Sequence, residues 1–231
     1  MVLFAVALFS CGLGTPGPPA EDDLAARRKS MVATQIEARG INDPLTLKAM
    51  REVPRHDFVP PEEIGAAYGD YPLPIGHRQT ISQPYIVAFM TEALRLRAGD
   101  KVLEVGTGSG YQAAVLAAMG MKVFSVEIVE PLAAESKERL ARLGYSGVSV
   151  RSGDGYAGWP EEAPFDGILV TAAAPRVPEP LKAQLKDGGR LVIPVGEDFQ
   201  ELVVVRRRGA SYEEKNVLAV RFVPMTGKVR Q

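Results

Sequence analysis

The clearest pattern of apolar and polar positions lies in the second half of the chain, where short apolar runs alternate with segments of helical spacing. Beyond residue 98, apolar runs typical of buried strands occupy 102–105, 122–127, 147–151, 165–171 and 189–195. Helices are predicted at 112–119, 131–143 and 179–186. This alternation predicts an α/β fold with a doubly wound, mostly parallel sheet that binds ligands at the carboxyl ends of its strands.

Two further sets of elements are expected outside this alternation. Segments 202–207 and 217–223 are predicted to form a C-terminal antiparallel strand pair. Near the N-terminus, one segment has apolar residues close to helical spacing and predicts an amphipathic helix over 21–39 that stops at Gly40; these residues are Leu24, Met31, Val32 and Ile36.

Two more helices are expected before the sheet begins. Asn42-Asp43-Pro44 offers a cap and a first-turn proline for a helix at 45–51. A third helix runs through Leu94 and Leu96, with Ser82 as its N-cap and Pro84 in its first turn. The intervening segment to residue 79 is rich in Pro, Gly and Tyr and is predicted to be an ordered loop, a kind of segment that is often functional.

The first fourteen residues are nearly all apolar, and a Pro-rich linker follows at 15–19. A basic region is missing before the apolar stretch, which is too short to span a bilayer, while Leu8-Phe9-Ser10-Cys11 loosely resembles a lipoprotein cleavage site. Two alternatives stay open: an exported or lipid-anchored protein, or a disordered extension ahead of a cytoplasmic one. We therefore expect a disordered or signal-like segment at 1–20 and one domain at 21–231, divided into helices and loops (21–97) and the sheet (98–231).

Composition narrows the classes of partner. At 231 residues with 46% hydrophobic and 24% charged residues, the chain fits one globular α/β domain, expected to be a monomer. A net charge of −1 provides no basic field for nucleic acid, and the small basic run at 206–208 is typical of a solvated strand end. One cysteine excludes an internal disulfide, and two isolated histidines make a metal site improbable.

The richest chemical motif follows the run at 102–105, in the sequence Glu104-Val105-Gly106-Thr107-Gly108-Ser109-Gly110-Tyr111. Its glycines are spaced G-x-G-x-G, and Tyr111 stands where a dinucleotide fingerprint has its third glycine, which disfavours NAD. Glu104 would repel a pyrophosphate but suits a positively charged ligand. A sulfonium that carries its own ammonium group is such a ligand; the alternative is a glycine turn in some other α/β protein.

Two acids follow the next strands. Glu127 ends the second predicted strand, where a carboxylate can accept hydrogen bonds from both hydroxyls of a ribose. Asp154-Gly155 follows the third, where the aspartate can accept a hydrogen bond from an adenine amino group, although an ordinary Asp-Gly turn is the alternative. Together with the glycine turn, these positions fall at successive strand ends and predict an adenosyl pocket.

The glycine run resembles motif I of the S-adenosyl-L-methionine-dependent methyltransferases, whose sheet is Rossmann-like. Further motifs, from about residue 31 to the C-terminus, resemble the protein-L-isoaspartate O-methyltransferase family; they are Pro54-Arg55-His56-Asp57-Phe58-Val59, Leu73-Pro74-Ile75-Gly76, Gln79-Thr80-Ile81-Ser82-Gln83-Pro84, Gly153-Asp154-Gly155, Pro164-Phe165-Asp166, Thr171-Ala172-Ala173 and Arg221-Phe222-Val223-Pro224. The Thr-Ile-Ser-x-Pro segment makes this resemblance specific, because methyltransferases in general do not share it.

The resemblance implies methyl transfer from S-adenosyl-L-methionine to the α-carboxylate of L-isoaspartyl residues in damaged proteins and peptides, a repair reaction in the cytoplasm. It implies that Ser82 is the active-site serine. The residues that it implies for the cofactor are Gln83, Pro84, Tyr85, Ile86, Asp154, Gly155, Thr226 and Gln231, which join Glu104, Gly106, Gly108 and Glu127 from the glycine turn and the strand end. The apolar N-terminal extension departs from the family pattern.

The expected chemistry agrees with these residues. An α-carboxylate has a pKa of roughly 3.5 and is ionised at neutral pH, so its attack on a sulfonium methyl group requires no general base. In-line positioning and hydrogen-bond donors to the carboxylate are required instead. Ser82 can supply such a donor, or it can be a structural N-cap. Two rival classes remain: a methyltransferase for small molecules or RNA, and a non-catalytic adenosyl-binding module.

Overall fold

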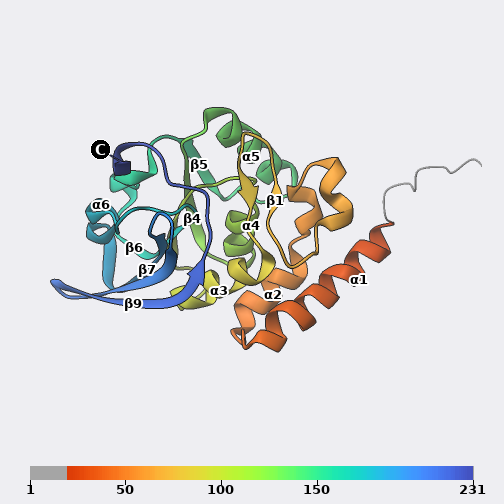
Figure 1. The fold of residues 1–231 in the computed structure, drawn as a ribbon, viewed down its shortest axis with the longest axis horizontal. Coiled ribbons are helices and arrows are strands. Elements are labelled where there is room, and N and C mark those ends of the chain that lie inside the picture. The colour runs from red at the N-terminus through yellow and green to blue at the C-terminus, as the bar shows by residue number, and fades with distance from the viewer. Residues whose placement is uncertain (1–19, 231) are drawn as a thin grey trace, which may run out of the picture.

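The structure, a computed structural model, describes residues 20–230 and contains a seven-stranded sheet of order β5-β4-β3-β6-β7-β8-β9 (Figure 1). The strands are β3 (Lys101–Val105), β4 (Lys122–Glu127), β5 (Ser149–Ser152), β6 (Phe165–Val170), β7 (Leu185–Val195), β8 (Gln200–Arg208) and β9 (Ser211–Val220). The first five pair in parallel, whereas β7–β8 and β8–β9 are antiparallel. The predicted doubly wound fold and its C-terminal strand pair are confirmed.

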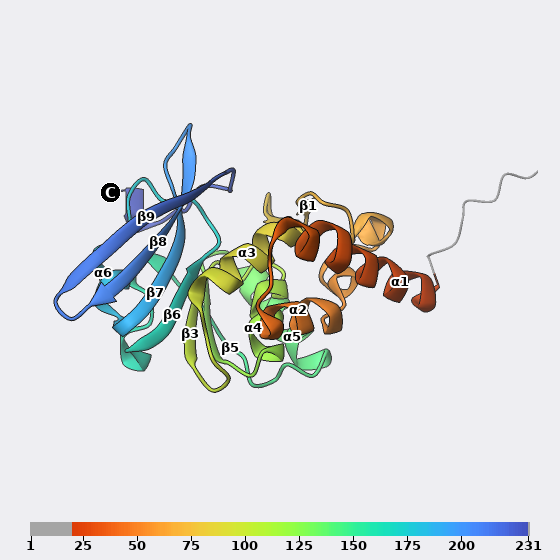
Figure 2. The same cartoon turned by 90° about the horizontal axis from the view of Figure 1, so that it is seen from below.

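Two apolar cores cover the two faces of the sheet, because successive strand residues point to opposite faces. Val102 belongs to the larger core, which packs against α1 (Glu21–Met31), α2 (Pro44–Glu52), α3 (Pro84–Leu94), α4 (Tyr111–Ala118) and α5 (Glu130–Arg142). Leu103 belongs to the smaller core, beneath α6 (Glu179–Ala183) and the C-terminal residues Met225 and Val229. Figure 2 shows α3 and α4 beside the middle of the sheet.

The predicted N-terminal helix is present with an irregular second half. After α1, the chain forms a π-helical turn (Val32–Ile36) and a 3-10 turn (Glu37–Arg39), and it stops at Gly40 with φ +92°. The four apolar residues predicted to face inward are all buried. The predicted cap of the next helix is also confirmed, because Asp43 Oδ2 accepts a hydrogen bond from the Thr46 N–H at 2.8 Å.

The prediction for the start of the third helix is wrong. Gln83, and not Ser82, is the N-cap of α3, because Pro84 occupies the first helical position. A residue that precedes proline is driven out of the helical region, and Gln83 is extended at φ −50°, ψ 137°. The end is also earlier than expected, since Arg95 is left-handed (φ +53°) and Leu96 lies outside the helix.

Some other boundaries differ from the sequence-based expectation. Residues 185 and 186 begin β7 rather than continue the helix that precedes them, and β9 begins at Ser211 rather than at 217. The expected loop before residue 79 contains two 3-10 turns, at Arg55–Phe58 and Pro61–Ala66.

A small hairpin covers the region in front of the main sheet. It consists of β1 (Leu73–Pro74) and β2 (Thr80–Ile81), and its turn is tied to α5 by a 3.1 Å contact between His77 Nε2 and Glu135 Oε1. No helix within residues 20–230 is long and apolar enough to cross a membrane. The predicted signal-like segment falls, except for Ala20, outside the described residues, and so does Gln231.

Candidate cofactor pocket and active site

A pocket opens at the carboxyl ends of β3, β4 and β6. Strand order reverses between β3 and β6, and this is where open α/β sheets bind their ligands. Other parts of the chain that line it include the β2 strand with Ser82, Val87 and Met90 of α3, the residues just before α5, and the C-terminal segment from Val223 to Thr226. Residues far apart in the sequence therefore meet at the predicted edge.

The glycine turn forms the floor of this pocket. Gly106, Gly108 and Gly110 all have positive φ angles, of +95°, +54° and +90°, which side chains disfavour. A Cβ atom on Gly106 would lie 2.3 Å from Thr171 Oγ1, the hydroxyl that donates to the Gly106 carbonyl at 2.6 Å. Gly110 is the N-cap of α4. Bare backbone at the turn is thus a steric requirement, and it leaves the surface open to a ligand.

Glu127 is fixed at the end of β4 by the backbone on both sides of the pocket. Its Oε2 accepts a hydrogen bond from the Gly108 N–H at 2.9 Å, and its Oε1 accepts one from the Val129 N–H at 3.0 Å. Each carboxylate oxygen has a second lone pair, so Glu127 can still accept two hydroxyl donors. Its position and orientation are suited to the paired hydroxyls of a ribose.

Glu104 is fully buried at the inner end of the pocket. Ser125 Oγ donates to its Oε2 and also lies 2.6 Å from Thr107 Oγ1, while Oε1 has no hydrogen-bond partner among the described residues. Burial raises the pKa of the Glu104 carboxyl from 4.5 to about 8, because desolvation disfavours the charged form; the Ser125 hydrogen bond opposes this and the nearby Glu127 charge adds to it. An unpartnered carboxyl oxygen in such a place favours a cationic ligand.

The charge of the lining as a whole agrees with that conclusion. Among the described residues it contains the carboxyl groups of Glu104 and Glu127 and no lysine, arginine or histidine. A nucleotide phosphate would meet repulsion here without a compensating cation. An adenosyl sulfonium with an ammonium group fits the donors, acceptors and charge of the pocket.

Asp154 and Gly155 differ in whether they line the pocket. Gly155 lines the pocket, and a Cβ atom on it would lie 2.3 Å from Val105 Cγ1, so the turn can pack here only with glycine. Asp154 does not line the pocket. Its Oδ1 accepts from the Tyr156 N–H at 2.9 Å and its Oδ2 from the Lys228 N–H at 2.8 Å.

Ser82 stands where two cavities meet. It lines the cofactor pocket and also a neighbouring surface pocket, together with Thr80, Thr171 and Val223. Within residues 20–230, its hydroxyl makes no hydrogen bond to another protein group and is half-buried. It is therefore free to donate to a ligand that reaches the cofactor pocket through its neighbour.

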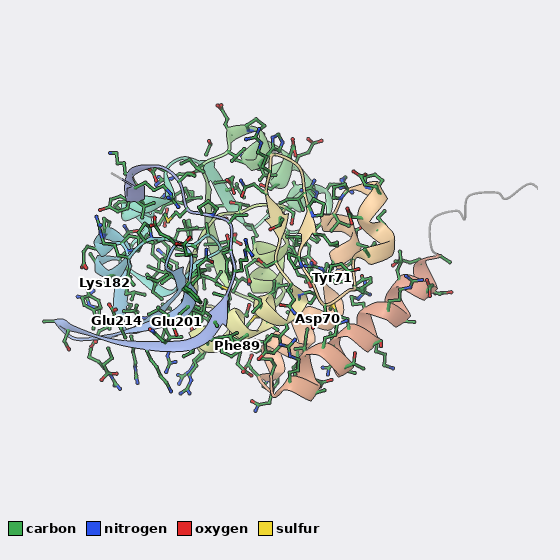
Figure 3. The ribbon with its side chains drawn as sticks, viewed as in Figure 1. Asp70, Tyr71, Phe89, Lys182, Glu201 and Glu214 are labelled. Carbon is green, nitrogen blue, oxygen red and sulfur yellow. The ribbon has the colours of Figure 1, made fainter. Side chains whose placement is uncertain are left out.

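The four residues after Ser82 are divided between that neighbouring pocket and the core. Gln83 and Ile86 line the neighbouring pocket. Pro84 and Tyr85 are buried and line neither, and the Tyr85 ring is covered by the Arg39 guanidinium, whose Cζ lies 3.4 Å from the ring centroid. Gln83 is held by Asp70 (labelled in Figure 3), whose Oδ1 accepts from Gln83 Nε2 at 2.8 Å.

The C-terminal segment reaches the pocket by pairing with the end of the sheet. The Ala173 N–H donates to the Val223 carbonyl at 2.8 Å, and the Met225 N–H donates to the Ala173 carbonyl at 2.7 Å. This places the exposed Thr226 in the lining, as the resemblance implied.

Several lining residues were not among the predicted site residues; they include Gln79, Thr80, Ile81, Gln112, Ile128, Val129 and Thr171. Thr171 directly follows β6, and the rule that ligands bind at strand ends could have found it. Gln112 could not be found in this way, because its inward position depends on a 2.9 Å hydrogen bond to Thr91 of α3.

Comparison with known proteins identifies the family of this chain. Residues 26–230 match the family model of protein-L-isoaspartate(D-aspartate) O-methyltransferase. The chain is 57% identical over 199 residues to a protein-L-isoaspartate O-methyltransferase of Gloeobacter violaceus, covering 85% of this chain and 97% of that one. It is 56% identical over 202 residues to protein-L-isoaspartate O-methyltransferase 2 of Shewanella sediminis, covering 87% and 83%.

Solved structures show the same similarity in three dimensions. A protein-L-isoaspartate O-methyltransferase superposes with a TM-score of 0.80 at 31% identity, covering 87% of this chain and 67% of that one. A Plasmodium falciparum structure described as the same enzyme, in complex with S-adenosyl-L-homocysteine, gives a TM-score of 0.75 at 28% identity over 86% of this chain and 98% of that one. With the motifs, fold and pocket in agreement, the chain belongs to the protein-L-isoaspartate(D-aspartate) O-methyltransferase family.

Proposed function

We propose that this chain transfers a methyl group from S-adenosyl-L-methionine to the α-carboxylate of L-isoaspartyl residues in damaged proteins and peptides. The observation that supports this most directly is the position of Ser82, which lines both an acidic adenosyl-type pocket and a neighbouring surface pocket. A binding module would need only the first pocket. Methyl transfer to a polypeptide needs both, in contact.

The residues of the cofactor pocket bind and orient the methyl donor. S-adenosyl-L-methionine, when bound, supplies an electrophilic methyl group on a sulfonium. Glu127 accepts the ribose hydroxyls, the glycine turn lies against the ligand, and Glu104 balances its positive charge. These groups are held by the backbone and by each other, so little reorganisation is needed at the moment of reaction.

Ser82 holds the carboxylate that receives the methyl group. Its hydroxyl would donate a hydrogen bond to one carboxylate oxygen and leave the other oxygen to attack the methyl carbon. The O–CH3 bond of a methyl ester would form as the S–CH3 bond breaks, and the electron pair of that bond would stay on sulfur, which leaves as a neutral thioether. The carboxylate is already ionised, with a reference pKa of roughly 3.5, so no residue has to remove a proton. Catalysis then depends on in-line placement, where an error of about an ångström can cost on the order of a hundredfold in rate.

A pair of isomeric peptides tests the substrate assignment. An isoaspartyl residue carries its chain through the side-chain carbonyl, so its free carboxylate is displaced from that of an aspartyl residue. Incubation with labelled S-adenosyl-L-methionine should methylate the isoaspartyl peptide and leave its aspartyl twin essentially unlabelled. Equal labelling of both peptides would refute the assignment, even if the chain bound the cofactor well.

The location and the oligomeric state belong to the same proposal. The enzyme acts as a monomer. It acts in the cytoplasm, where damaged proteins are accessible to it. Light scattering at the assay concentration should give a mass near 24.9 kDa. Recovery of the protein outside the cytoplasm, in a shortened or lipidated form, would contradict the location.

A further inference from the structure

A second groove lies at the opposite end of the sheet from the cofactor pocket. It runs between α3, where Phe89 is labelled in Figure 3, and the outer strands β7, β8 and β9. Arg190 lines it and is paired with Gly167, which is paired with Val102 near the start of β3. The groove is therefore near the amino ends of the central strands, whereas the cofactor pocket is at their carboxyl ends.

Two arginines that line this groove lie side by side on neighbouring strands. Arg190 of β7 and Arg206 of β8 are direct cross-strand partners, so their side chains share one face of the sheet. Like charges in that relationship destabilise a sheet. Arg190 donates only to the Ala93 carbonyl, at 3.3 Å, and the buried Nε of Arg206 has no hydrogen-bond partner among the described residues.

Further positive charge gathers around this pair. Arg95 lines the same groove from the end of α3. Burial lowers the pKa of Arg190, and the charges of Arg95, Arg206 and Arg208 lower it further. Arg208 is neutralised by Glu213, at 3.1 Å, whereas Arg95, Arg190 and Arg206 form no ion pair within residues 20–230.

The acidic side chains of the groove already have partners, although Glu213 is also the direct cross-strand neighbour of Arg206. Asp43 accepts hydrogen bonds from the N–H and hydroxyl groups of Thr46, and Glu92 accepts the backbone N–H groups of Asn42 and Asp43 at 2.7 Å. The remaining two are Glu213, which pairs with Arg208, and Glu214, which lies 3.6 Å from Lys182 Nζ. Among the described residues, four guanidinium groups that line the groove form no ion pair; they belong to Arg95, Arg97, Arg190 and Arg206.

We infer that Arg95, Arg190 and Arg206 form a binding site for a phosphate group. Guanidinium groups bind phosphate oxygens through paired hydrogen bonds, and all three of these side chains line the groove. A phosphate carries about −1.5 to −2 charges at neutral pH, which offsets the mutual repulsion of the three arginines. The group is either free inorganic phosphate or a phosphate monoester, and both share this chemistry.

Calorimetric titration of the full chain tests the site. Inorganic phosphate and O-phosphoserine are titrated separately, with ionic strength held constant by potassium chloride and with serine as the blank. Saturable binding of inorganic phosphate is expected, and Arg206→Gln and Arg95→Gln should each weaken it by about tenfold or more, the scale for losing a charge-assisted hydrogen bond. Binding of O-phosphoserine as well would assign the site to phosphate monoesters; its absence would assign it to the free anion.

Control variants separate a site from a general charge effect. Arg206→Lys retains the charge but not the paired donors, so it should bind phosphate more weakly than the original chain. Lys137→Gln removes an exposed charge from α5, far from the groove, and should bind phosphate normally. All variants should methylate at the original rate, since none touches the cofactor pocket. Absence of saturable phosphate binding, or equal loss in Lys137→Gln and Arg206→Gln, would overturn the inference.

Discussion

Asp154 and Lys228 are joined by a hydrogen bond of 2.8 Å from the backbone N–H of Lys228 to Asp154 Oδ2, across 74 positions of the chain. Gly227 lies against the same carboxylate, and a Cβ atom on it would be 2.6 Å from Asp154 Oδ2. The turn after β5 thus anchors the C-terminal segment that carries Thr226 into the cofactor pocket. Asp154 can influence the cofactor through this segment without lining the pocket itself.

Replacement of Asp154 by alanine should weaken S-adenosyl-L-methionine binding by a few kcal/mol at most, because two backbone donors lose a charged acceptor. The fold should survive, as judged by circular dichroism. Gly227→Ala is the matched variant, since it disturbs the anchor and keeps the carboxylate. Cofactor affinity is measured by calorimetry. Similar losses of affinity in the two variants would assign the effect to the C-terminal segment. An unchanged affinity in Gly227→Ala would favour direct contact between Asp154 and the adenine.

Glu127 is predicted to contribute directly to cofactor affinity. Glu127→Ala removes the acceptor for the ribose hydroxyls and for the N–H groups of Gly108 and Val129, so the dissociation constant should rise by roughly ten- to a hundredfold. Glu130→Gln is the control, because Glu130 is exposed and lies outside the pocket lining. An unchanged affinity in Glu127→Ala would remove Glu127 from the site.

Glu104 should make cofactor binding depend on pH. Its pKa of about 8 in the free protein means that it carries a proton at neutral pH, and a cationic ligand favours the charged form. Binding should therefore release a proton, and affinity should rise with pH up to about pH 8 and then level, by no more than about tenfold per pH unit. Glu104→Gln should abolish this slope. Calorimetry in buffers of different ionisation enthalpy measures the released proton, and a flat affinity in the original chain would contradict the assignment.

The same carboxyl group has an opposite effect on the unbound protein. Because the folded-state pKa lies above the ordinary value of 4.5, the group contributes stability that is fully present below pH 4.5 and is lost as pH rises through about 8. The free energy of unfolding should fall over that interval and fall less in Glu104→Gln.

At saturating cofactor, kcat should stay flat from about pH 6 to 8, because the attacking carboxylate is ionised throughout.

The central strands could be predicted almost to the residue, since a buried parallel strand requires a nearly continuous apolar run. β4 has the predicted bounds, and β3 differs by one residue. The first half of β9 could not be predicted in this way. It is an edge strand with the polar sequence Ser211-Tyr212-Glu213-Glu214-Lys215-Asn216, and its exposure removes the apolar signal.

The site could be predicted as far as local sequence defines geometry. Strand-end positions of Gly106 and Glu127 follow from the alternation of elements, whereas the burial of Glu104 and the anchoring of Asp154 depend on Ser125 and Lys228, which are distant in the chain. The wrong prediction of Ser82 as the N-cap could have been avoided from the local sequence. A proline at the first helical position makes its direct predecessor the cap, so Gln83 could have been predicted.

That correction sharpens the test of Ser82. Because the hydroxyl caps no helix and bonds to no described protein group, its removal should leave the melting temperature nearly unchanged. Loss of one positioned donor to the reacting carboxylate should lower kcat by roughly ten- to a thousandfold, with cofactor affinity almost unaltered. Ser82→Ala is compared with Ser149→Ala, an exposed serine on the far edge strand β5, and with Ser82→Thr, which retains a hydroxyl. Rates are measured with the isoaspartyl peptide at saturating cofactor. Full activity of Ser82→Ala would show that the carboxylate is held by other groups, whereas partial rescue by Ser82→Thr would assign the donor to the hydroxyl itself.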